Sequence, residues 1–164
     1  MKKILLKKWR GLQQNSHEEA RIIFDAREIH VNSTISFSDQ KEQVIYQLAL
    51  HEDWTVSEMH IQVYGSAKQS FSPEDAGVKF VDFEISPLTN SLPVNFLKYH
   101  QQMHLEEEVL LIRFPSLSAQ PHRQSYQLLD KEVCYRNLTS GFESDIIFDK
   151  DGFVMEYSGL FMQV

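Results

Sequence analysis

Cysteine is almost absent from this chain, which has only Cys134. A single cysteine cannot form a disulfide within the chain, and it cannot supply a zinc site built on thiolates. Cys134 lies in an alternating stretch, where a free thiol usually packs as a small hydrophobic group rather than acting as a reactive one. The sequence therefore predicts no disulfide framework, and it fits a reducing compartment.

Long hydrophobic runs are also missing. The N-terminus begins with lysines, as a signal peptide does, but Lys7 and Lys8 interrupt its apolar run after Ile4, Leu5 and Leu6. No other stretch approaches the roughly 18 apolar residues that a membrane helix needs. We expect a chain without a transmembrane segment that stays in the cytoplasm.

Positive charge is scarce beyond the first ten residues. The formal net charge is −7 and the isoelectric point is near 5.5. A protein with this negative net charge repels the phosphate backbone of nucleic acids, and no long basic stretch of the sequence offsets the repulsion. We therefore do not expect nucleic acid as a partner.

The size and composition are those of an ordinary globular protein. A chain of 164 residues is long enough for one substantial core, so we expect a single domain over residues 1–164. The hydrophobic fraction of 42% and the charged fraction of 24% fit this class. Eleven Phe, six Tyr and two Trp favour strands.

Alternation of apolar and polar residues recurs along the whole chain and predicts strands with one buried face. Residues 109–112 are apolar on both faces and predict a central strand that ends near Phe114 and Pro115. Residues 149–152 join two alternating runs and predict a tight hairpin with Gly152 in the left-handed conformation. The clearest alternating runs are residues 44–50, 59–63, 142–148 and 153–157.

One segment has helical spacing instead. Four large hydrophobic or aromatic residues that are three or four positions apart predict a helix over residues 92–103, with Ser91 placed to cap it and Pro93 in its first turn. Because a sheet with one apolar face needs a cover, we expect a curled sheet wrapped around this helix, with the four side chains buried. They are Leu92, Phe96, Tyr99 and Met103.

Three longer stretches carry a family resemblance. Their motifs are an Asp-containing strand before a Thr-Pro-x-Thr-Asn-Thr-Leu-Pro pattern, an Arg/Phe/Pro-x-Leu stretch, a Gln-x-Tyr pair, and terminal Asp-x-Asp-Gly and Tyr-x-Gly-Leu motifs. With them the chain resembles the glycolipid-binding family of bacterial proteins, formerly a domain of unknown function. The stretches read VDFEISPLTNSLPVNFL, VLLIRFPSLSAQPHRQSYQLL and YRNLTSGFESDIIFDKDGFVMEYSGLF.

The matching positions span nearly the whole chain. Ser86 and Ser91 stand where the family has threonine, and Phe161 stands where tryptophan is common. These mild changes leave the fold unaffected, although a hydroxyl-specific contact would be altered. The other matches are Asp82, Pro87, Thr89, Asn90, Leu92, Pro93, Phe114, Pro115, Leu117, Gln124, Tyr126, Phe142, Asp149, Asp151, Gly152, Tyr157, Gly159 and Leu160, with weaker ones at Trp9, His17, Glu18 and Trp54.

The resemblance implies a mainly β fold, the spiral β-roll, in which a many-stranded curled antiparallel sheet wraps around a single α-helix. It also implies a homodimer and an amphiphilic ligand such as a glycolipid. The apolar tail would lie in the interior of the curled sheet and the polar head at its rim.

Six residues are candidates for ligand contact. Thr89 and Asn90 belong to the corner at residues 86–93, where they either brace the strand-to-helix connection or also reach a head group. Arg113 ends the most apolar strand and is either an edge charge that reaches water or an anchor for an anionic head group. Three amphipathic rings either pack in the core or stack on a sugar. These rings belong to Trp54, Tyr126 and Tyr157.

The histidines and glutamates near residue 100 raise the question of a metal site. His100 and His104 are four residues apart and precede Glu107 and Glu108, which fits a solvated helix face better than a metal site that would lack a third ligand on the helix. No nucleophile elbow, phosphate loop or dinucleotide fingerprint occurs in the sequence. We therefore expect no metal, no cofactor and no enzymatic activity.

Three functions remain as hypotheses. The first is a non-catalytic binding protein for an amphiphile such as a glycolipid. The second is a homodimeric interaction protein whose interior is filled by side chains and holds no small ligand. The third is a hydrolase whose catalytic groups only the fold would bring together.

Overall fold

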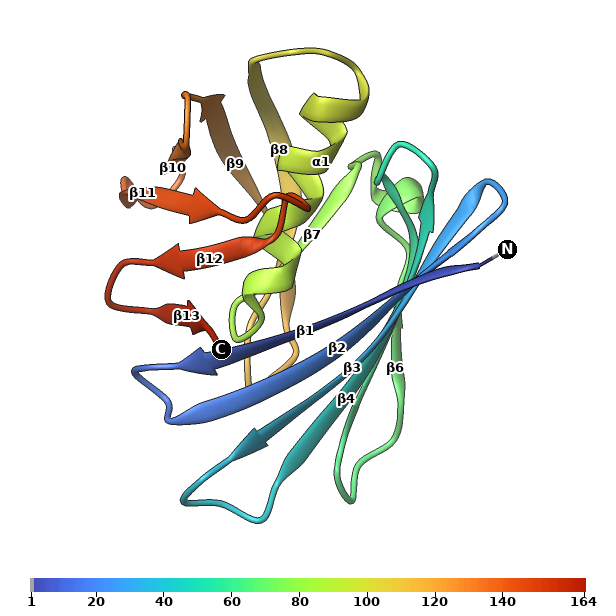
Figure 1. Cartoon of the computed structure of the whole chain (residues 1–164). Helices are drawn as coiled ribbons and strands as arrows, with labels where there is room; N and C mark the ends of the chain where they lie inside the picture. The colour runs from blue at the N-terminus through green and yellow to red at the C-terminus, as the bar shows by residue number, and fades with distance from the viewer. Residues whose placement is uncertain (1) are drawn as a thin grey trace.

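One sheet makes up most of the molecule. The computed structural model describes residues 2–164, and in that part of the chain thirteen strands join into a single sheet (Figure 1). The N-terminal half runs as a series of antiparallel neighbours, as the alternating pattern predicts. Its strands are β1 (Lys3–Gly11), β2 (Ser16–Asp25), β3 (Glu28–Phe37), β4 (Gln43–His51), β5 (Val56–Val63) and β6 (Gln69–Phe71).

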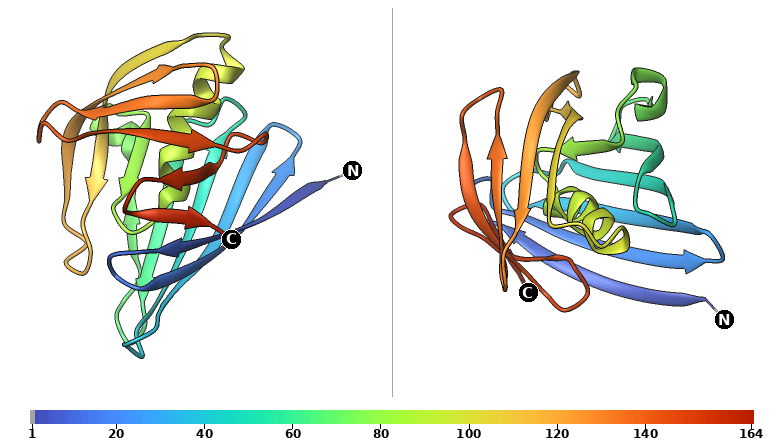
Figure 2. Two further views of the ribbon diagram at one scale, coloured as in Figure 1. Left: turned by 60° about the vertical axis from the view of Figure 1, so that its left-hand side comes forward. Right: turned by 90° about the horizontal axis from the view of Figure 1, so that it is seen from above.

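The C-terminal half closes back onto the N-terminal strand. The spatial order is β6-β5-β4-β3-β2-β1-β13-β12-β11-β10-β9-β8-β7, so the last strand pairs with the first. The sheet curls around its own interior (Figure 2). The remaining strands are β7 (Phe80–Phe83), β8 (His104–Ile112), β9 (Ala119–Leu128), β10 (Glu132–Asn137), β11 (Glu143–Phe148), β12 (Val154–Tyr157) and β13 (Phe161–Gln163).

One strand pair departs from the predicted antiparallel sheet. β7 and β8 are parallel, whereas every other pair in the order is antiparallel. The reason is the crossover between them, which runs through the 3-10 turn η2 (Pro87–Asn90) and the helix α1 (Ser91–Tyr99). A second 3-10 turn, η1 (Pro73–Ala76), precedes β7.

The helix is shorter than residues 92–103. It ends at Tyr99 because Gln101 takes a left-handed conformation with φ of 55°, which closes the helix without a glycine signal in the sequence. Ser91 is its first residue rather than its cap, and the Ser91 hydroxyl instead accepts a hydrogen bond from the Val154 N–H at 3.2 Å.

The helix lies inside the curl, but only part of its predicted face is buried (Figure 1). Leu92 and Phe96 are buried, as expected. Tyr99 is 49% exposed and Met103, which lies beyond the helix, is 59% exposed, so their predicted burial is wrong. Tyr99 lies in the last turn of the helix, where the neighbouring Lys98 and His100 are exposed as well. Met103 follows the left-handed Gln101, where the chain turns away from the core.

β7 lies between two packed layers. Phe80 meets Phe96 of the helix edge-on at 5.4 Å between ring centroids, and Phe83 meets Tyr46 of β4 edge-on at 5.8 Å. Neighbouring β8 is buried along residues 109–112 except at the half-buried Leu110, which confirms a strand that is apolar on both faces. The interior is therefore filled by side chains here.

The predicted hairpin at residues 149–152 is confirmed. It joins β11 to β12, with the Gly152 N–H donating to the Asp149 carbonyl at 3.1 Å and φ of 85° at Gly152. The Asn95 amide of α1 donates to the Gly152 carbonyl at 2.9 Å. The hairpin therefore holds the helix inside the curl.

No helix within residues 2–164 is long and apolar enough to cross a membrane.

Candidate ligand groove

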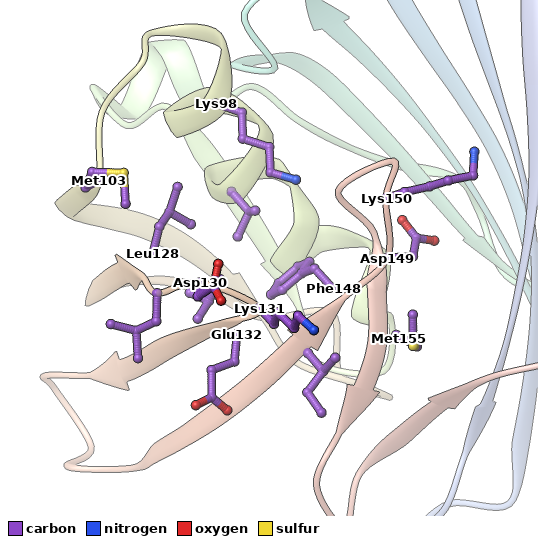
Figure 3. Close-up of a pocket in the computed structure, with 14 residues that line it drawn as sticks. Lys98, Met103, Leu128, Asp130, Lys131, Glu132, Phe148, Asp149, Lys150 and Met155 are labelled. Atoms are coloured by element: carbon purple, nitrogen blue, oxygen red, sulfur yellow. The ribbon is translucent and has the colours of Figure 1, made fainter.

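A groove of about 490 Å³ opens at one end of the roll (Figure 3). It lies between α1, the turn from β9 to β10 and the hairpin from β11 to β12. Its volume falls within the range of about 300 to 1,000 Å³ that is usual for small-molecule sites. The lining residues are Val94, Lys98, Met103, Leu128, Leu129, Asp130, Lys131, Glu132, Val133, Ile147, Phe148, Asp149, Lys150 and Met155.

The floor of the groove is continuous with the core. Val94 of the helix and Val133 of β10 are buried, while Leu128 and Phe148 are half-buried against the same core cluster. These side chains come from four elements, α1, β9, β10 and β11, which pack in the core, so the floor is rigid and apolar.

The walls of the groove expose apolar side chains to solvent. Met103, Leu129, Ile147 and Met155 all line it and all count among the exposed large hydrophobic residues of the protein. Single exposed hydrophobic residues are common, but a contiguous group around a concavity marks a site where something apolar binds. The walls and the floor together offer a surface for an alkyl chain.

The rim carries charges of both signs. Lys98 extends from α1 on one side, and Asp130 and Lys131 of the β9–β10 turn lie on the other, next to Glu132 at the start of β10 (Figure 3). None of these four takes part in an ion pair with another group in residues 2–164. The rim therefore presents both hydrogen-bond donors and acceptors to a ligand.

Asp149 lines the groove but is already engaged. Its Oδ2 accepts hydrogen bonds from Lys7 Nζ and Gln163 Nε2, both at 2.8 Å, and Oδ1 accepts from two hairpin N–H groups. Burial alone would raise the pKa of Asp149, but the hydrogen bonds from Lys7 and Gln163 hold it below its ordinary value. Its role is to fasten the hairpin to β1 and β13.

The corner residues lie in the core rather than in the groove. The Thr89 hydroxyl accepts from the Phe83 N–H at 3.1 Å and donates to the Ser86 carbonyl at 2.9 Å. The Asn90 amide donates to the Tyr126 hydroxyl at 3.3 Å, and Tyr126 is itself buried. The structure thus brings Asn90 and Tyr126 together, and these bonds brace the strand-to-helix connection.

The other three candidates also lie outside the lining of the groove. Arg113 is exposed, with Nη1 3.4 Å from Glu84 Oε2. Trp54 is buried edge-on against Phe153, and Tyr157 is buried among core rings. Contact of any of the six candidates with a ligand stays a prediction.

A buried carboxyl group ties the corner to the N-terminal strands. Glu18 of β2 accepts at Oε1 from the hydroxyls of Ser33 (2.8 Å), Tyr46 (2.6 Å) and Ser86 (2.8 Å). Burial raises the pKa of Glu18 to about 7 although these hydrogen bonds act in the opposite direction. Within residues 2–164, Oε2 of Glu18 has no hydrogen-bond partner.

A serine, a histidine and a glutamate line up on the outer face of the sheet. His60 Nδ1 lies 2.7 Å from Ser70 Oγ, and His60 Nε2 lies 3.1 Å from Glu58 Oε1. Glu58 and Ser70 are exposed, and the three residues belong to β5 and β6 rather than to the groove. The line can pass a proton from hydroxyl to imidazole, and its central His60 is partly buried, with 26% of its side chain exposed.

Within residues 2–164, no three His, Cys, Asp or Glu side chains come together in a way that could hold a metal ion. His100 instead lies 3.3 Å from Asp53.

The comparisons with known proteins agree with the architecture. A model of the family described as "Putative glycolipid-binding" matches residues 7–163. The chain belongs to this family. A crystal structure of a DUF1089 family protein from Pseudomonas aeruginosa has a TM-score of 0.70 and 22% sequence identity, covering 90% of this chain and 92% of that chain. At this identity the likeness shows a shared fold. No curated protein matches the chain.

Proposed function

We propose that this protein binds an amphiphile with an apolar tail and a hydroxylated head, as a glycolipid has, in the groove between α1 and the two hairpins. The observation that carries the proposal is the group of exposed apolar side chains at Met103, Leu129, Ile147 and Met155 above a buried apolar floor. The family description supports the same class of ligand.

In this proposal the apolar tail of the ligand lies in the groove at the end of the roll rather than deep in the interior of the sheet. Rings of Trp9, Trp54, Phe83 and Phe153 occupy the core between the two halves of the sheet. The groove, in contrast, is open and apolar. Each methylene group that leaves water on such a surface contributes about 0.8 kcal/mol.

In this proposal the polar head of the ligand lies at the charged rim of the groove. A sugar hydroxyl both donates and accepts hydrogen bonds, so it needs partners of both kinds. Lys98 and Lys131 supply donors, and Asp130 and Glu132 supply acceptors, on two sides of the same opening. This mixed rim suits a neutral polyhydroxylated head, because both its donors and its acceptors then find partners.

Homodimerisation without a small ligand is the alternative. The filled core is compatible with it, and exposed apolar side chains can also belong to a protein interface. A concavity of about 490 Å³ whose rim offers both donors and acceptors is, however, typical of a small-molecule site. Binding of an amphiphile accounts for both features and is therefore the preferred proposal.

Native mass spectrometry after incubation with a total lipid extract tests the proposal. We expect a retained amphiphile on the wild-type protein and its loss in Met155→Arg, which places a charge against the tail. Met162→Arg is the matched control, because Met162 has nearly the same exposure as Met155, 47% against 43%, but does not line the groove. A wild-type protein that retains nothing, or equal retention in both variants, would contradict the proposal.

A further inference from the structure

Glu58, His60 and Ser70 form a proton relay on the outer face of the sheet. Glu58 and His60 are two residues apart on β5, so their side chains lie on the same face. Ser70 of β6 is the direct cross-strand partner of His60, and β6 is an edge strand of the sheet (Figure 1). Strand pairing therefore assembles the three groups, which explains why no local sequence motif marks them.

The distances in the relay fit activation of the serine. Ser70 Oγ lies 2.7 Å from His60 Nδ1, which is within the range for a nucleophile and its base. Glu58 Oε1 lies 3.1 Å from His60 Nε2, and its negative charge favours the tautomer that carries the proton on Nε2. Nδ1 is then free to accept the hydroxyl proton. Serine proteases use the two ring nitrogens the other way round, but they likewise need one free and one protonated nitrogen.

Two other histidines of the sheet pair with glutamate but lack the serine. His30 contacts Glu28, and His51 contacts Glu74. Within residues 2–164, neither of these imidazoles contacts a serine hydroxyl. Of these three pairs in the described part of the chain, the one at His60 is therefore the one that can take a proton from a serine.

A hollow of about 380 Å³ adjoins the relay and shares no lining residue with the groove. This outer hollow lies over Ala49, whose small side chain stands between its cross-strand partners His30 and Glu58. His60 also lines it, and most of its other lining residues are polar or charged. Its volume is that of a small-molecule site, and its polarity suits a polar ligand.

Hydrogen-bond donors surround the histidine as well. His60 lines a second, smaller hollow of about 100 Å³ together with Gln47, Gln62 and Lys68. Gln47 lines both hollows, so the two adjoin each other. Amide and ammonium groups can stabilise the negative charge that develops on a carbonyl oxygen when a nucleophile attacks it.

We infer that Ser70 is a nucleophile with His60 as its general base, and that it takes up the acyl group of a small ester with a polar alcohol. The Ser70 oxygen forms a bond to the carbonyl carbon while its proton passes to His60 Nδ1. The bond from that carbon to the alcohol oxygen then breaks, and His60 returns the proton to the departing alkoxide. Water removes the acyl group by the same route, giving its proton to His60 as the Ser70 oxygen leaves and is reprotonated.

An alkyl fluorophosphonate tests the inference on the full-length protein. In this reaction the Ser70 oxygen bonds to phosphorus, fluoride leaves, and the hydroxyl proton passes to His60. We expect a single adduct, which peptide mass spectrometry should place at Ser70. The protein should also hydrolyse p-nitrophenyl acetate through an acetyl group on the same residue.

Four variants separate an activated serine from an ordinary surface hydroxyl. Ser70→Ala should abolish the adduct, whereas Ser72→Ala, at another exposed serine nearby, should keep it. His60→Gln removes the base and should slow labelling roughly 100-fold or more. His51→Gln should label at the wild-type rate, because His51 also pairs with a glutamate but contacts no serine within residues 2–164. None of these four residues belongs to the hydrophobic core, so the melting temperatures should stay close to that of the wild type.

Glu58 acts as a positioning residue, and nitrogen NMR of labelled histidine tests its role apart from activity. We expect the His60 ring of the wild type to carry its proton on Nε2 and Glu58→Gln to shift the balance toward Nδ1. A wild-type ring protonated on Nδ1 would overturn the inference, because the hydroxyl would then have no base. So would the absence of an adduct, labelling spread over several surface serines, or equal rates in His60→Gln and the wild type.

Discussion

The hydroxyl of Tyr46 donates a hydrogen bond of 2.6 Å to the buried carboxyl group of Glu18. The same hydroxyl lies 2.7 Å from Ser86 Oγ. These contacts connect strands β2 and β4 to the corner at residues 86–93, which leads into the helix. This corner positions α1, and α1 forms one wall of the groove. A polar contact far from the groove therefore helps to set its shape.

Glu18 should make the stability of the protein depend on pH. Burial raises its pKa from an ordinary value of 4.5 to about 7, so the folded state holds the proton more tightly than the unfolded state. The stabilisation is complete below pH 4.5 and is lost as the pH rises to about 7, a change of roughly 3 kcal/mol. Glu18→Gln should flatten this part of the pH profile in urea unfolding. An unchanged slope in the variant would show that Glu18 does not titrate in this range.

Phe96 and Tyr99 lie in the same turn of helix α1 but should differ sharply in their contribution to stability. Phe96 is 8% exposed and packs against Phe80, so Phe96→Ala should cost about 3 to 5 kcal/mol of unfolding free energy. Tyr99 is half-exposed at the end of the helix, so Tyr99→Ala should cost much less, about 1 kcal/mol or below. Similar losses in chemical denaturation would contradict the packing of the helix inside the curl.

Two glycines with nearly the same backbone conformation provide a matched pair. Gly152 and Gly141 have φ of 85° and 82°, so alanine at either position costs about 1 to 2 kcal/mol from the backbone alone. A Cβ at Gly152 would also lie 2.2 Å from the Asn95 side chain, whereas a Cβ at Gly141 meets nothing within 4 Å. Gly152→Ala should therefore lower the melting temperature more than Gly141→Ala. Equal effects would mean that the contact between helix and hairpin adjusts freely.

Lys98 and Arg113 distinguish two positions for the head group. The groove proposal predicts that Lys98→Ala weakens binding of an alkyl glycoside by up to about 1.5 to 3 kcal/mol, because a hydrogen bond from a charged donor is lost. Arg113 lies outside the groove, so Arg113→Ala should leave the affinity unchanged. Calorimetric titration of both folded variants decides between them. The reverse pattern would move the head group to the corner at residues 86–93.

Local features of the fold could be predicted from the sequence. The hairpin at residues 149–152 has its own turn chemistry, and the alternation of β4 and β5 follows directly from burial of one face. The family motifs added the curled architecture. The pairing of β13 with β1 joins the two ends of the chain, and no local pattern specifies it.

The groove could not be predicted because its parts come from separate segments. Helical spacing predicts a buried helix face for Met103, whereas its exposure follows from the left-handed conformation at Gln101, which no glycine marks in the sequence. Leu129 and Ile147 are ordinary apolar residues until the fold brings them together. Glu18 likewise looks like a surface residue within an acidic run, and only the approach of Ser86 shows that it is buried.

The most direct measurement of the central proposal is calorimetric titration with alkyl maltosides of increasing chain length, each below its critical micelle concentration. If the tail lies in the groove, each added pair of methylene groups should strengthen binding by up to about 1.6 kcal/mol, or roughly tenfold, until the groove is full. Met155→Arg should remove this dependence and Met162→Arg should keep it. Affinities of the wild-type protein that do not change with chain length would contradict the proposal that the groove binds an apolar tail.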